Sequence, residues 1–493
     1  MTMVSRPSFA ALLLVLLIGC APGLRVARPS DPVEALRYDI DAILADSIFL
    51  QARTGIMVKS IDRGEILYER DGKMLNRPAS NMKLLTSAAA ISLLGQEFAF
   101  TTSVHADTLS VNGILYGNLY FKGGGNPDLK SSDLDTIVQQ IQLAGIQEVQ
   151  GRIYADVSYF DDLFWGYGWN WDDEPYQYAA FLSPLTVNDN CIRVTVTPGS
   201  FAGEPLMVAT NPSTSFITLI NQGTTAADSA RRPLRVTRLF KERRNTILIE
   251  GEMLVYARPA ERVLSLWRPE LYAAQLLKEA LERSGIAIWG EPMVGTSPPG
   301  TREIALHSQR LDSMVVNLNK VSDNLSAELT LKTLGAVKRG VPGSSDQGIS
   351  VLYEFLDSLG IDTTAIRVAD GSGLSFYNLL TAQMLVQLLE GMAKKPEQFP
   401  LFHTSLPIAG VDGTISNRMK GTPAEGNLRA KTGTISGVSS LSGYVKTLDG
   451  ETFVFSMSMQ NFILPSRLYQ RAQDRIGALL AGFSRTRLTA GHP

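Results

Sequence analysis

The hydrophobic pattern at the start of the chain predicts a helix, a hairpin and a second helix in turn. Apolar residues recur at helical spacing within residues 32–50, which predicts a helix there. Two short apolar runs, 55–60 and 65–68, flank an Asp-Arg-Gly turn and predict a β-hairpin. An Ala-rich apolar segment then covers residues 80–94 and stops before a glycine, which predicts a second helix.

The pattern changes at about residue 98. Short stretches of alternating apolar and polar residues follow, separated by turns rich in Gly, Asn, Asp and Pro, up to about residue 261. The stretches predicted as strands include 101–105, 113–121, 151–157, 192–197 and 246–256. Residues 98–261 are therefore predicted to form a β-rich insertion of one or two subdomains.

Helical periodicity returns after this insertion and gives way to strands near the C-terminus. Helices are predicted at 271–284, 311–334, 381–394 and 465–480, and strands at 428–434, 438–446 and 451–459. Together with the early hairpin, they predict an α+β fold, in which one antiparallel sheet with flanking helices is split in sequence by the insertion. The main domain is thus predicted to consist of residues 34–97 and 262–493.

Composition and charge exclude several classes of function. The 493 residues are 44% hydrophobic and 19% charged, which is ordinary for a folded protein of more than one domain. A net charge of −2 gives no electrostatic basis for binding nucleic acid. The four histidines are scattered and form no close pair, which disfavours both a zinc site and a histidine-based triad. No metal or cofactor is predicted.

The N-terminus has the features of an export signal. Arg6 precedes an apolar run at residues 10–18, which is too short to span a bilayer comfortably. The run ends in Leu-Ile-Gly before Cys20, a pattern that resembles the bacterial lipobox, in which the cysteine is lipidated and becomes the mature N-terminus. An ordinary signal peptide or a short anchor is the alternative. We interpret the pattern as that of a lipoprotein.

This interpretation divides the first residues and sets the location of the protein. Residues 1–19 are the predicted signal peptide, and residues 20–33 a tether that leads away from the lipid on Cys20. The predicted location is the periplasmic side of the cell envelope, and Ala21 resembles the residue found in lipoproteins sent to an outer membrane, where one exists. The other cysteine, Cys191, is predicted to be a buried thiol in a strand.

Ser80 and Lys83 are the first candidates for chemistry. They lie at the start of the second predicted helix, where residues three apart share a face, so hydroxyl and amine can meet. A serine needs a base to become a nucleophile, and a neutral lysine can be that base. The alternative is a capping serine beside a solvated lysine, which short Ser/Lys patterns would favour if this one stood alone.

Two further motifs change this interpretation. Ser322-Asp323-Asn324 interrupts or caps the helical run at 311–334, and Lys431-Thr432-Gly433-Thr434 lies in a predicted strand. Taken singly, they are a helix cap and an ordinary edge strand. The order S-x-x-K, S-D-N, K-T-G is, however, that of penicillin-binding proteins and class A β-lactamases. Three motifs in this order predict a serine acyl-transfer site.

An aromatic and acidic loop at residues 164–173 is a second candidate region. It holds three of the five tryptophans, and such loops often line substrate grooves. Trp171 and Asp172 are therefore predicted to bind substrate. A loop pinned by aromatic packing is an equally good interpretation.

With these motifs, the chain resembles the low-molecular-mass class C penicillin-binding proteins, the D-alanyl-D-alanine carboxypeptidases and endopeptidases of peptidase family S13. The resemblance extends over residues 55–461 and includes Pro78-Ala79 before the serine, the Asp-Gly-Ser-Gly-Leu-Ser stretch 370–375, and the long insertion itself. It implies a penicillin-binding-protein fold that acts on peptidoglycan stem peptides, is acylated by β-lactams and needs no cofactor.

The resemblance also implies a role for each motif residue. Ser80 would form the acyl-enzyme, Lys83 would take its proton, Ser322 would pass a proton to the leaving amine, and Asn324 would bind Lys83 and a substrate amide. The K-T-G-T stretch, namely Lys431, Thr432, Gly433 and Thr434, would bind the terminal carboxylate and complete the oxyanion hole. Since two ammonium groups at one site repel, we expect Lys83 to be neutral and Lys431 charged.

Two alternatives of other kinds stay open. A β-lactamase-like hydrolase would share the motifs, and a non-catalytic envelope-binding lipoprotein would share the N-terminus. Turnover of a β-lactam would reveal the first. The intact Ser80, Lys83, Asn324 and Lys431 argue against the second.

Overall fold

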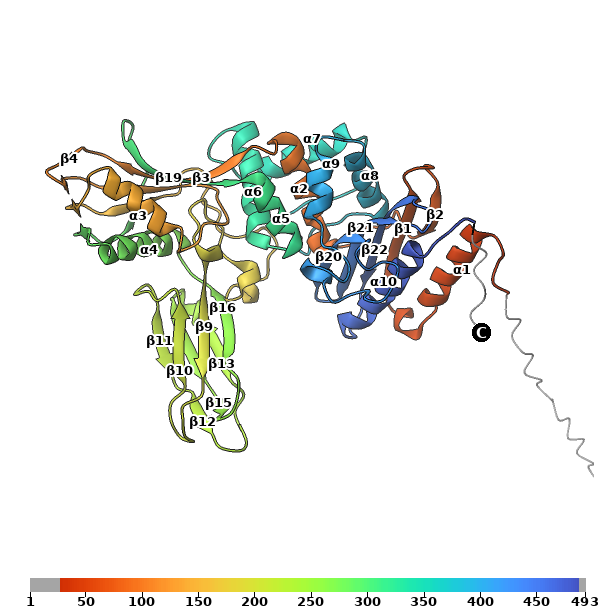
Figure 1. Ribbon diagram of the computed structural model, residues 1–493, viewed down its shortest axis with the longest axis horizontal. Helices are drawn as coiled ribbons and strands as arrows, with labels where there is room; N and C mark the ends of the chain where they lie inside the picture. Colours follow the sequence, from red (N-terminus) through yellow and green to blue (C-terminus); the bar gives the residue numbers. More distant parts are fainter. Residues whose placement is uncertain (1–26, 487–493) are drawn as a thin grey trace, which may run out of the picture.

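The computed structural model describes residues 27–486, and a five-stranded sheet forms the centre of its main domain. The sheet has the order β2-β1-β22-β21-β20, and every neighbouring pair is antiparallel. Its strands are β1 (Arg53–Ser60), β2 (Ile66–Arg70), β20 (Arg429–Ile435), β21 (Val438–Lys446) and β22 (Thr452–Gln460). Because β1 pairs with β22, segments from both ends of the chain share this sheet (Figure 1). The predicted antiparallel sheet with flanking helices is confirmed.

Helices cover both faces of this sheet, and alternation along the strands explains how. Ile56 and Val58 join the core beneath α1 (Pro32–Leu44) and α10 (Ser466–Ala481), whereas Met57 joins the opposite core. The opposite face is covered by α2 (Met82–Leu93), α5 (Leu311–Lys320), α6 (Asn324–Arg339), α7 (Ser345–Ser358), α8 (Ala382–Ala393) and α9 (Phe399–Ser405). The sheet is therefore a buried layer between two helical layers.

The inserted region begins with a second body built on two sheets. One sheet has the order β18-β8-β6-β3-β19 and the other the order β17-β7-β5-β4. Their strands are β3 (Ala99–Ala106), β4 (Ser110–Val111), β5 (Ile114–Leu115), β6 (Leu119–Gly124), β7 (Glu148–Val149), β8 (Ile153–Asp156), β17 (Ala287–Ile288), β18 (Met293–Val294) and β19 (Arg302–Arg310). The helices α3 (Leu134–Leu143) and α4 (Pro269–Arg283) pack against them in one core.

A lobe of short strands projects from this body (Figure 1). It comprises β9 (Cys191–Thr197), β10 (Met207–Asn211), β11 (Thr218–Asn221), β12 (Thr224–Ala226), β13 (Arg235–Arg238), β14 (Thr246–Glu250), β15 (Glu252–Leu254) and β16 (Ala260–Ser265). The β-rich character predicted for residues 98–261 agrees with these strands. Cys191 is buried, as predicted, and burial raises the pKa of its thiol well above the usual value.

The insertion ends later than the predicted boundary at residue 261. The chain leaves the main domain at β3 and returns at β19, which pair antiparallel with Ala99 opposite Arg310. Helix α4, which was assigned to the second part of the main domain, packs in the core of the insertion. The return point is therefore Leu311, where α5 begins. The two paired strands lie about 200 residues apart in the chain, with the whole insertion between them. A contact between residues so far apart leaves no local signal in the sequence.

The predicted export signal lies outside the described residues, as do Cys20 and Ala21. Over residues 27–486, no helix has the length and apolar character needed to cross a membrane. The first described helix, α1, begins at Pro32 behind the capping side chain of Asp31, which accepts from two backbone N–H groups.

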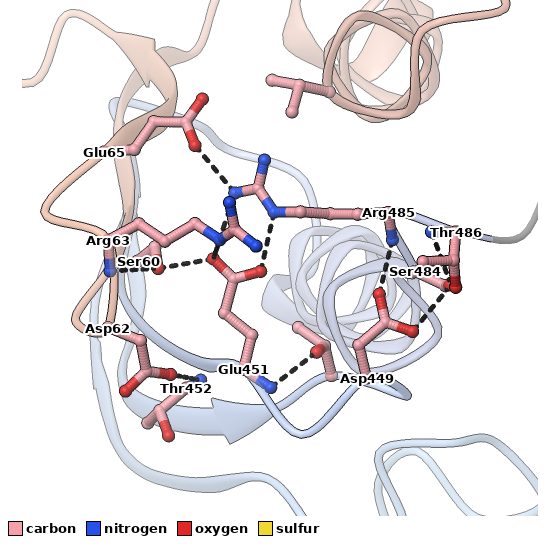
Figure 2. Close-up of polar contacts among 12 residues, drawn as sticks. Ser60, Asp62, Arg63, Glu65, Asp449, Glu451, Thr452, Ser484, Arg485 and Thr486 are labelled. Carbon is pink, nitrogen blue, oxygen red and sulfur yellow. Dashed lines mark hydrogen bonds and ion pairs between the residues drawn. The ribbon is translucent and has the colours of Figure 1, made fainter.

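Arg485 fastens the end of the described chain to the sheet (Figure 2). Its guanidinium donates to both carboxylate oxygens of Glu451, at 2.8 and 3.0 Å, and to Glu65 at 2.7 Å. Ser60 of β1 donates to the same Glu451 carboxylate at 2.5 Å, and Asp449 accepts the Arg485 backbone N–H at 2.6 Å. The bond from Arg485 is the main reason why the pKa of Glu451 lies below its usual value.

Replacing Arg485 with Ala should therefore lower the free energy of unfolding at neutral pH by about 1–2 kcal/mol, since charged hydrogen bonds to a shielded carboxylate are lost. A carboxyl with a lowered pKa adds stability that disappears as pH falls through its folded pKa, so the difference from wild type should shrink in acid. Urea unfolding at several pH values measures it. Arg471→Ala, at an exposed position of α10, is the control, and an equal loss in both variants would contradict the prediction.

Candidate active site

Ser80 lies where the main domain meets the insertion, at the start of a helix. It is in the 3₁₀ turn η2 (Ala79–Asn81), just before α2 rather than within its first regular turn. Asn81 fixes this turn to the sheet, because its side chain donates to the Ser442 hydroxyl at 2.7 Å. The turn thus holds the serine half-exposed above the edge strand β20.

The Lys83 amine has three oxygen partners and is completely buried. Its Nζ lies 3.0 Å from Ser80 Oγ, 2.6 Å from Asn324 Oδ1 and 2.8 Å from the carbonyl oxygen of Ser372. The contact predicted between Ser80 and Lys83 is therefore present. An ammonium here would use its three hydrogens on these partners, whereas a neutral amine can accept the serine proton.

The second motif connects α5 to α6. Asp323 is the residue that caps α6, since its carboxylate accepts from Leu325 N–H and Ser326 N–H at 3.2 and 2.9 Å. Ser322 precedes it with a φ of 66°, an uncommon left-handed conformation for a serine. Its hydroxyl accepts from Lys431 Nζ at 2.8 Å. Ser322 is thus directed to the third motif rather than capping the helix.

Strand β20 brings the third motif against the serine turn. A Cβ on Gly433 would lie 3.0 Å from the Ser80 backbone nitrogen and 2.6 Å from the Pro78 carbonyl oxygen, so only glycine permits this approach. Lys431 is completely buried, while Thr432 is half-buried and Thr434 exposed. The three motifs therefore converge at Ser80.

The two lysines differ in the negative charge around them. Burial lowers the pKa of Lys83 to about 8, although the carboxyl groups of Asp323, Asp370 and Glu328 oppose this shift. Burial and then the positive charge of Lys83 lower the pKa of Lys431 well below its usual value. The protein's own groups therefore favour the proton on Lys83, which reverses the order expected from the sequence, because carboxyl groups act on Lys83 and not on Lys431.

The loop 370–375 holds the carbonyl that binds Lys83. Asp370 is buried and accepts from the backbone N–H groups of Gly373 and Ser375 at 2.8 and 2.6 Å. Glu328, on α6, accepts from the Ser372 N–H at 2.8 Å. Burial and the nearby Asp370 raise the pKa of Glu328. The sequence indicated Asp370 only as part of a stretch shared with the family and gave no signal for Glu328, whose role depends on tertiary contact.

Two pockets open on either side of the serine. The larger holds about 380 Å³ and is lined by Ser80, Asn170, Asp173, Tyr178, Ser322, Asn324, Gly373, Leu374, Phe376, Thr434, Ile435 and Ser436. The smaller holds about 270 Å³ and is lined by Ser80, Ser322, Thr414, Arg418, Thr432, Thr434 and Gln470. Ser80 lies at their boundary, so a bound chain could place one part in each pocket.

The predicted substrate-binding residues Trp171 and Asp172 do not line the larger pocket. They lie in the 3₁₀ turn η3 (Trp171–Asp173), whose flanking and last residues, Asn170 and Asp173, form that wall instead. Tyr178 joins them, and its carbonyl oxygen accepts from Asn324 Nδ2 at 2.7 Å. The loop thus reaches the pocket at Ser80, but through Asn170 and Asp173 and not through the two residues that the sequence indicated.

The model of the D-Ala-D-Ala carboxypeptidase 3 (S13) family matches residues 36–481. The chain belongs to this family. Its resemblance to the class C penicillin-binding proteins is confirmed.

Individual relatives agree with this assignment. The chain is 37% identical to a D-alanyl-D-alanine carboxypeptidase of Actinomadura sp. (strain R39), over 96% of this chain and 89% of that protein. It is 28% identical to the D-alanyl-D-alanine carboxypeptidase DacB of Haemophilus influenzae, over 82% of this chain and 84% of the relative. The crystal structure of penicillin-binding protein 4 (DacB) from H. influenzae superposes with a TM-score of 0.80 at 24% identity, covering 90% of this chain and 100% of that one. This superposition shows a shared fold.

The pKa of Lys83 predicts how acylation of Ser80 depends on pH. A lysine base works only when deprotonated, so the second-order rate constant for acylation, which reports the free enzyme, should rise with pH and reach half its plateau near pH 8. Asp323→Asn removes a carboxylate that favours the ammonium and keeps a side chain able to cap α6. Its rising limb should therefore move to lower pH.

Stopped-flow acylation by a β-lactam between pH 5 and 10 measures the rising limb in the wild type and in Asp323→Asn. Asp312→Asn, at a half-buried acidic position on α5 that pairs with Arg310, is the charge-matched control and should keep the wild-type profile. An unmoved or upward-shifted limb in Asp323→Asn would show that Lys83 is not the titrating base.

Proposed function

We propose that this S13 family member is a serine-type D-alanyl-D-alanine carboxypeptidase and/or endopeptidase that acts on peptidoglycan stem peptides through an acyl-enzyme on Ser80. The observation that carries the proposal is the buried Lys83 amine, 3.0 Å from Ser80 Oγ and held in place by Asn324 and the Ser372 carbonyl. A buried lysine with a lowered pKa, directed at a serine in an open pocket, is the arrangement that activates a hydroxyl nucleophile.

The first step forms a bond from Ser80 Oγ to the carbonyl carbon between two D-alanines, while the Lys83 amine takes the hydroxyl proton. A substrate carboxylate beside Lys431 would raise the pKa of Lys431, and a charged Lys431 would in turn favour loss of the proton from Lys83. Substrate binding would then prepare the base in the same event that positions the peptide bond. Lys83 contacts Ser80, Lys431 contacts Ser322, and the positive charge of Lys83 lowers the pKa of Lys431, which supports this coupling.

The leaving D-alanine fits the smaller pocket. Ser322 lines it and is bonded to Lys431, so this hydroxyl can pass a proton to the leaving nitrogen as the C–N bond breaks. Thr432, Thr434 and the Arg418 guanidinium line the same pocket, and these donors favour a carboxylate at this end. This composition favours carboxypeptidase action, in which the terminal residue carries the free carboxylate.

The backbone N–H groups of Ser80 and Thr434 are proposed to form the oxyanion hole, since both residues line both pockets. Water then attacks the ester on Ser80 and releases the shortened peptide. A β-lactam resembles the D-Ala-D-Ala end and keeps its leaving group attached, so it should acylate Ser80 and leave slowly. Rapid β-lactam turnover would instead indicate a β-lactamase-like hydrolase.

Replacing Ser80 with Ala should abolish covalent labelling by a fluorescent penicillin and release of D-alanine from a D-Ala-D-Ala peptide, because the atom that forms the ester is gone. Gel fluorescence and a D-alanine assay measure the two losses. Ser92→Ala, near the C-terminal end of α2 and away from both pockets, should keep both activities. Persistent labelling of the folded Ser80→Ala protein would refute Ser80 as the nucleophile.

We further propose that the protein is a lipoprotein of the cell envelope, anchored on its periplasmic side through lipid on Cys20. The support is the lipobox-like run before Cys20, and a diacylated cysteine supplies enough apolar chain for stable anchoring. The residues between Cys20 and the start of α1 at Pro32 would then separate the catalytic domain from the membrane surface, so the predicted tether 20–33 is two residues too long.

Mass spectrometry of the N-terminal peptide from membrane-extracted protein tests this location. The expected mature peptide begins at a diacylated Cys20, and Cys20→Ala should abolish lipidation and release the protein from the membrane fraction. Cys191→Ala serves as the matched control. A wild-type peptide in which unmodified Cys20 is still joined to Gly19 would contradict the proposal.

A further inference from the structure

A third pocket lies beside the active site and contains no catalytic residue. It holds about 460 Å³ and is lined by Asp162, Leu163, Phe164, Trp165, Trp171, Glu174, Phe181, Phe240, Lys241, Arg243 and Trp267. Its walls come from the loop before β9, the turn between β13 and β14 and the link between β16 and α4, so it lies where the projecting lobe joins the body of the insertion. Three of its residues are tryptophans.

The aromatic rings form a platform that stays open to solvent. Trp171 is 66% exposed, and its ring stacks on Phe240 with 5.9 Å between centroids and 29° between planes. Behind it, Phe181 contacts Trp165 and Trp267, with centroids 5.2 and 5.0 Å apart. A largely exposed tryptophan supported by other rings offers a flat apolar surface to a ligand.

The polar groups at this platform carry charges of both signs. A buried arginine, Arg238, fixes Glu174 with a hydrogen bond of 2.5 Å, and its Nε has no partner among the described residues. Lys241 Nζ lies 5.7 Å from the centre of the Trp171 ring, and the Arg243 guanidinium lies 5.3 Å from that of Trp267. Donors and acceptors therefore surround an aromatic floor.

This pocket and the active site share a wall. Asn170 and Asp173 line the larger pocket at Ser80, while their sequence neighbours Trp171 and Glu174 line the aromatic pocket. Aromatic contacts also link the aromatic pocket to the loop 370–375 of the active site. Trp165, in the aromatic pocket, contacts Trp169, and the indole N–H of Trp169 donates to Asp370 at 3.0 Å. A ligand in the aromatic pocket would therefore be a close neighbour of a peptide bound at Ser80.

We propose that the aromatic pocket binds a sugar unit of the glycan strand to which the stem peptides are attached. The proposal rests on the proposed function, which places a stem peptide in the adjacent pocket. Pyranose rings have apolar faces that stack on tryptophan, and their hydroxyl and acetamido groups need both donors and acceptors. Glu174 and Asp162 supply acceptors, and Lys241 and Arg243 supply donors.

The same composition disfavours other occupants. A lipid chain would take water away from the charged groups of Asp162, Lys241 and Arg243 without replacing its hydrogen bonds. The active site would thus prefer peptides that are still attached to glycan over free peptides, without any change in the reacting groups.

The first experiment measures binding without catalysis. Isothermal titration with peptide-free oligomers of N-acetylglucosamine and N-acetylmuramic acid should show binding to the Ser80→Ala protein, weakened roughly threefold to tenfold by a second change, Trp171→Ala, since aromatic stacking contributes on that scale. Trp289→Ala is the matched control, because Trp289 is 72% exposed and lies elsewhere on the insertion. No binding to Ser80→Ala, or equal binding with and without Trp171, would overturn the proposal.

The second experiment compares two substrates in a catalytically intact protein. Phe240→Ala removes the ring that supports Trp171, and it should lower kcat/KM for a disaccharide-pentapeptide severalfold more than for the free pentapeptide. An equal fall for both substrates would overturn the proposal. If the wild type hydrolyses neither peptide, the proposed function fails, while the titration with oligosaccharide still decides whether the pocket binds sugar.

Discussion

The cost of burying two lysine amines beside one serine governs the site. An ammonium removed from water must be paired or lose its proton. Lys83 has three oxygen partners and three carboxyl groups near enough to favour its charge, whereas Lys431 has a hydroxyl and a carbonyl oxygen. Among the described residues, no carboxylate therefore partners the Lys431 amine. A substrate carboxylate would supply this partner, which makes the charge balance itself a means of recognition.

Contacts from both the main domain and the insertion hold the oxygen partners of Lys83 in place. Asn324 begins a helix capped by Asp323, and its amide nitrogen is bonded to the Tyr178 carbonyl of the insertion. The Ser372 carbonyl is held by a loop that Asp370 and Glu328 tie together from inside. Main domain and insertion are thus joined at the reacting groups. A change in the insertion can affect catalysis even though the three motifs all belong to the main domain.

The insertion also explains how one catalytic centre could recognise a polymer. The 3₁₀ turn at Trp171–Asp173 stands between the serine pocket and the aromatic pocket, and each side of it presents different residues. The lobe contributes Phe240 and Lys241 from a turn between two strands. The three motifs around Ser80 supply the reacting groups. The surfaces around them come partly from the insertion, and these surfaces would determine which part of a large substrate is bound.

The sequence predicted many of the helices and strands and all three motifs, because both depend on local order. Apolar spacing indicates helices and strands, and residues three apart, such as Ser80 and Lys83, lie close together at the start of a helix. The sequence did not reveal where the insertion ends, since β19 returns to β3 through contacts remote in sequence. The sequence also gave no signal that Glu328 holds the loop beside Lys83, or that Asp173 and not Asp172 lines the pocket at Ser80. The protonation order of Lys83 and Lys431 was decided by tertiary structure alone, because it depends on which carboxyl groups folding brings near each amine.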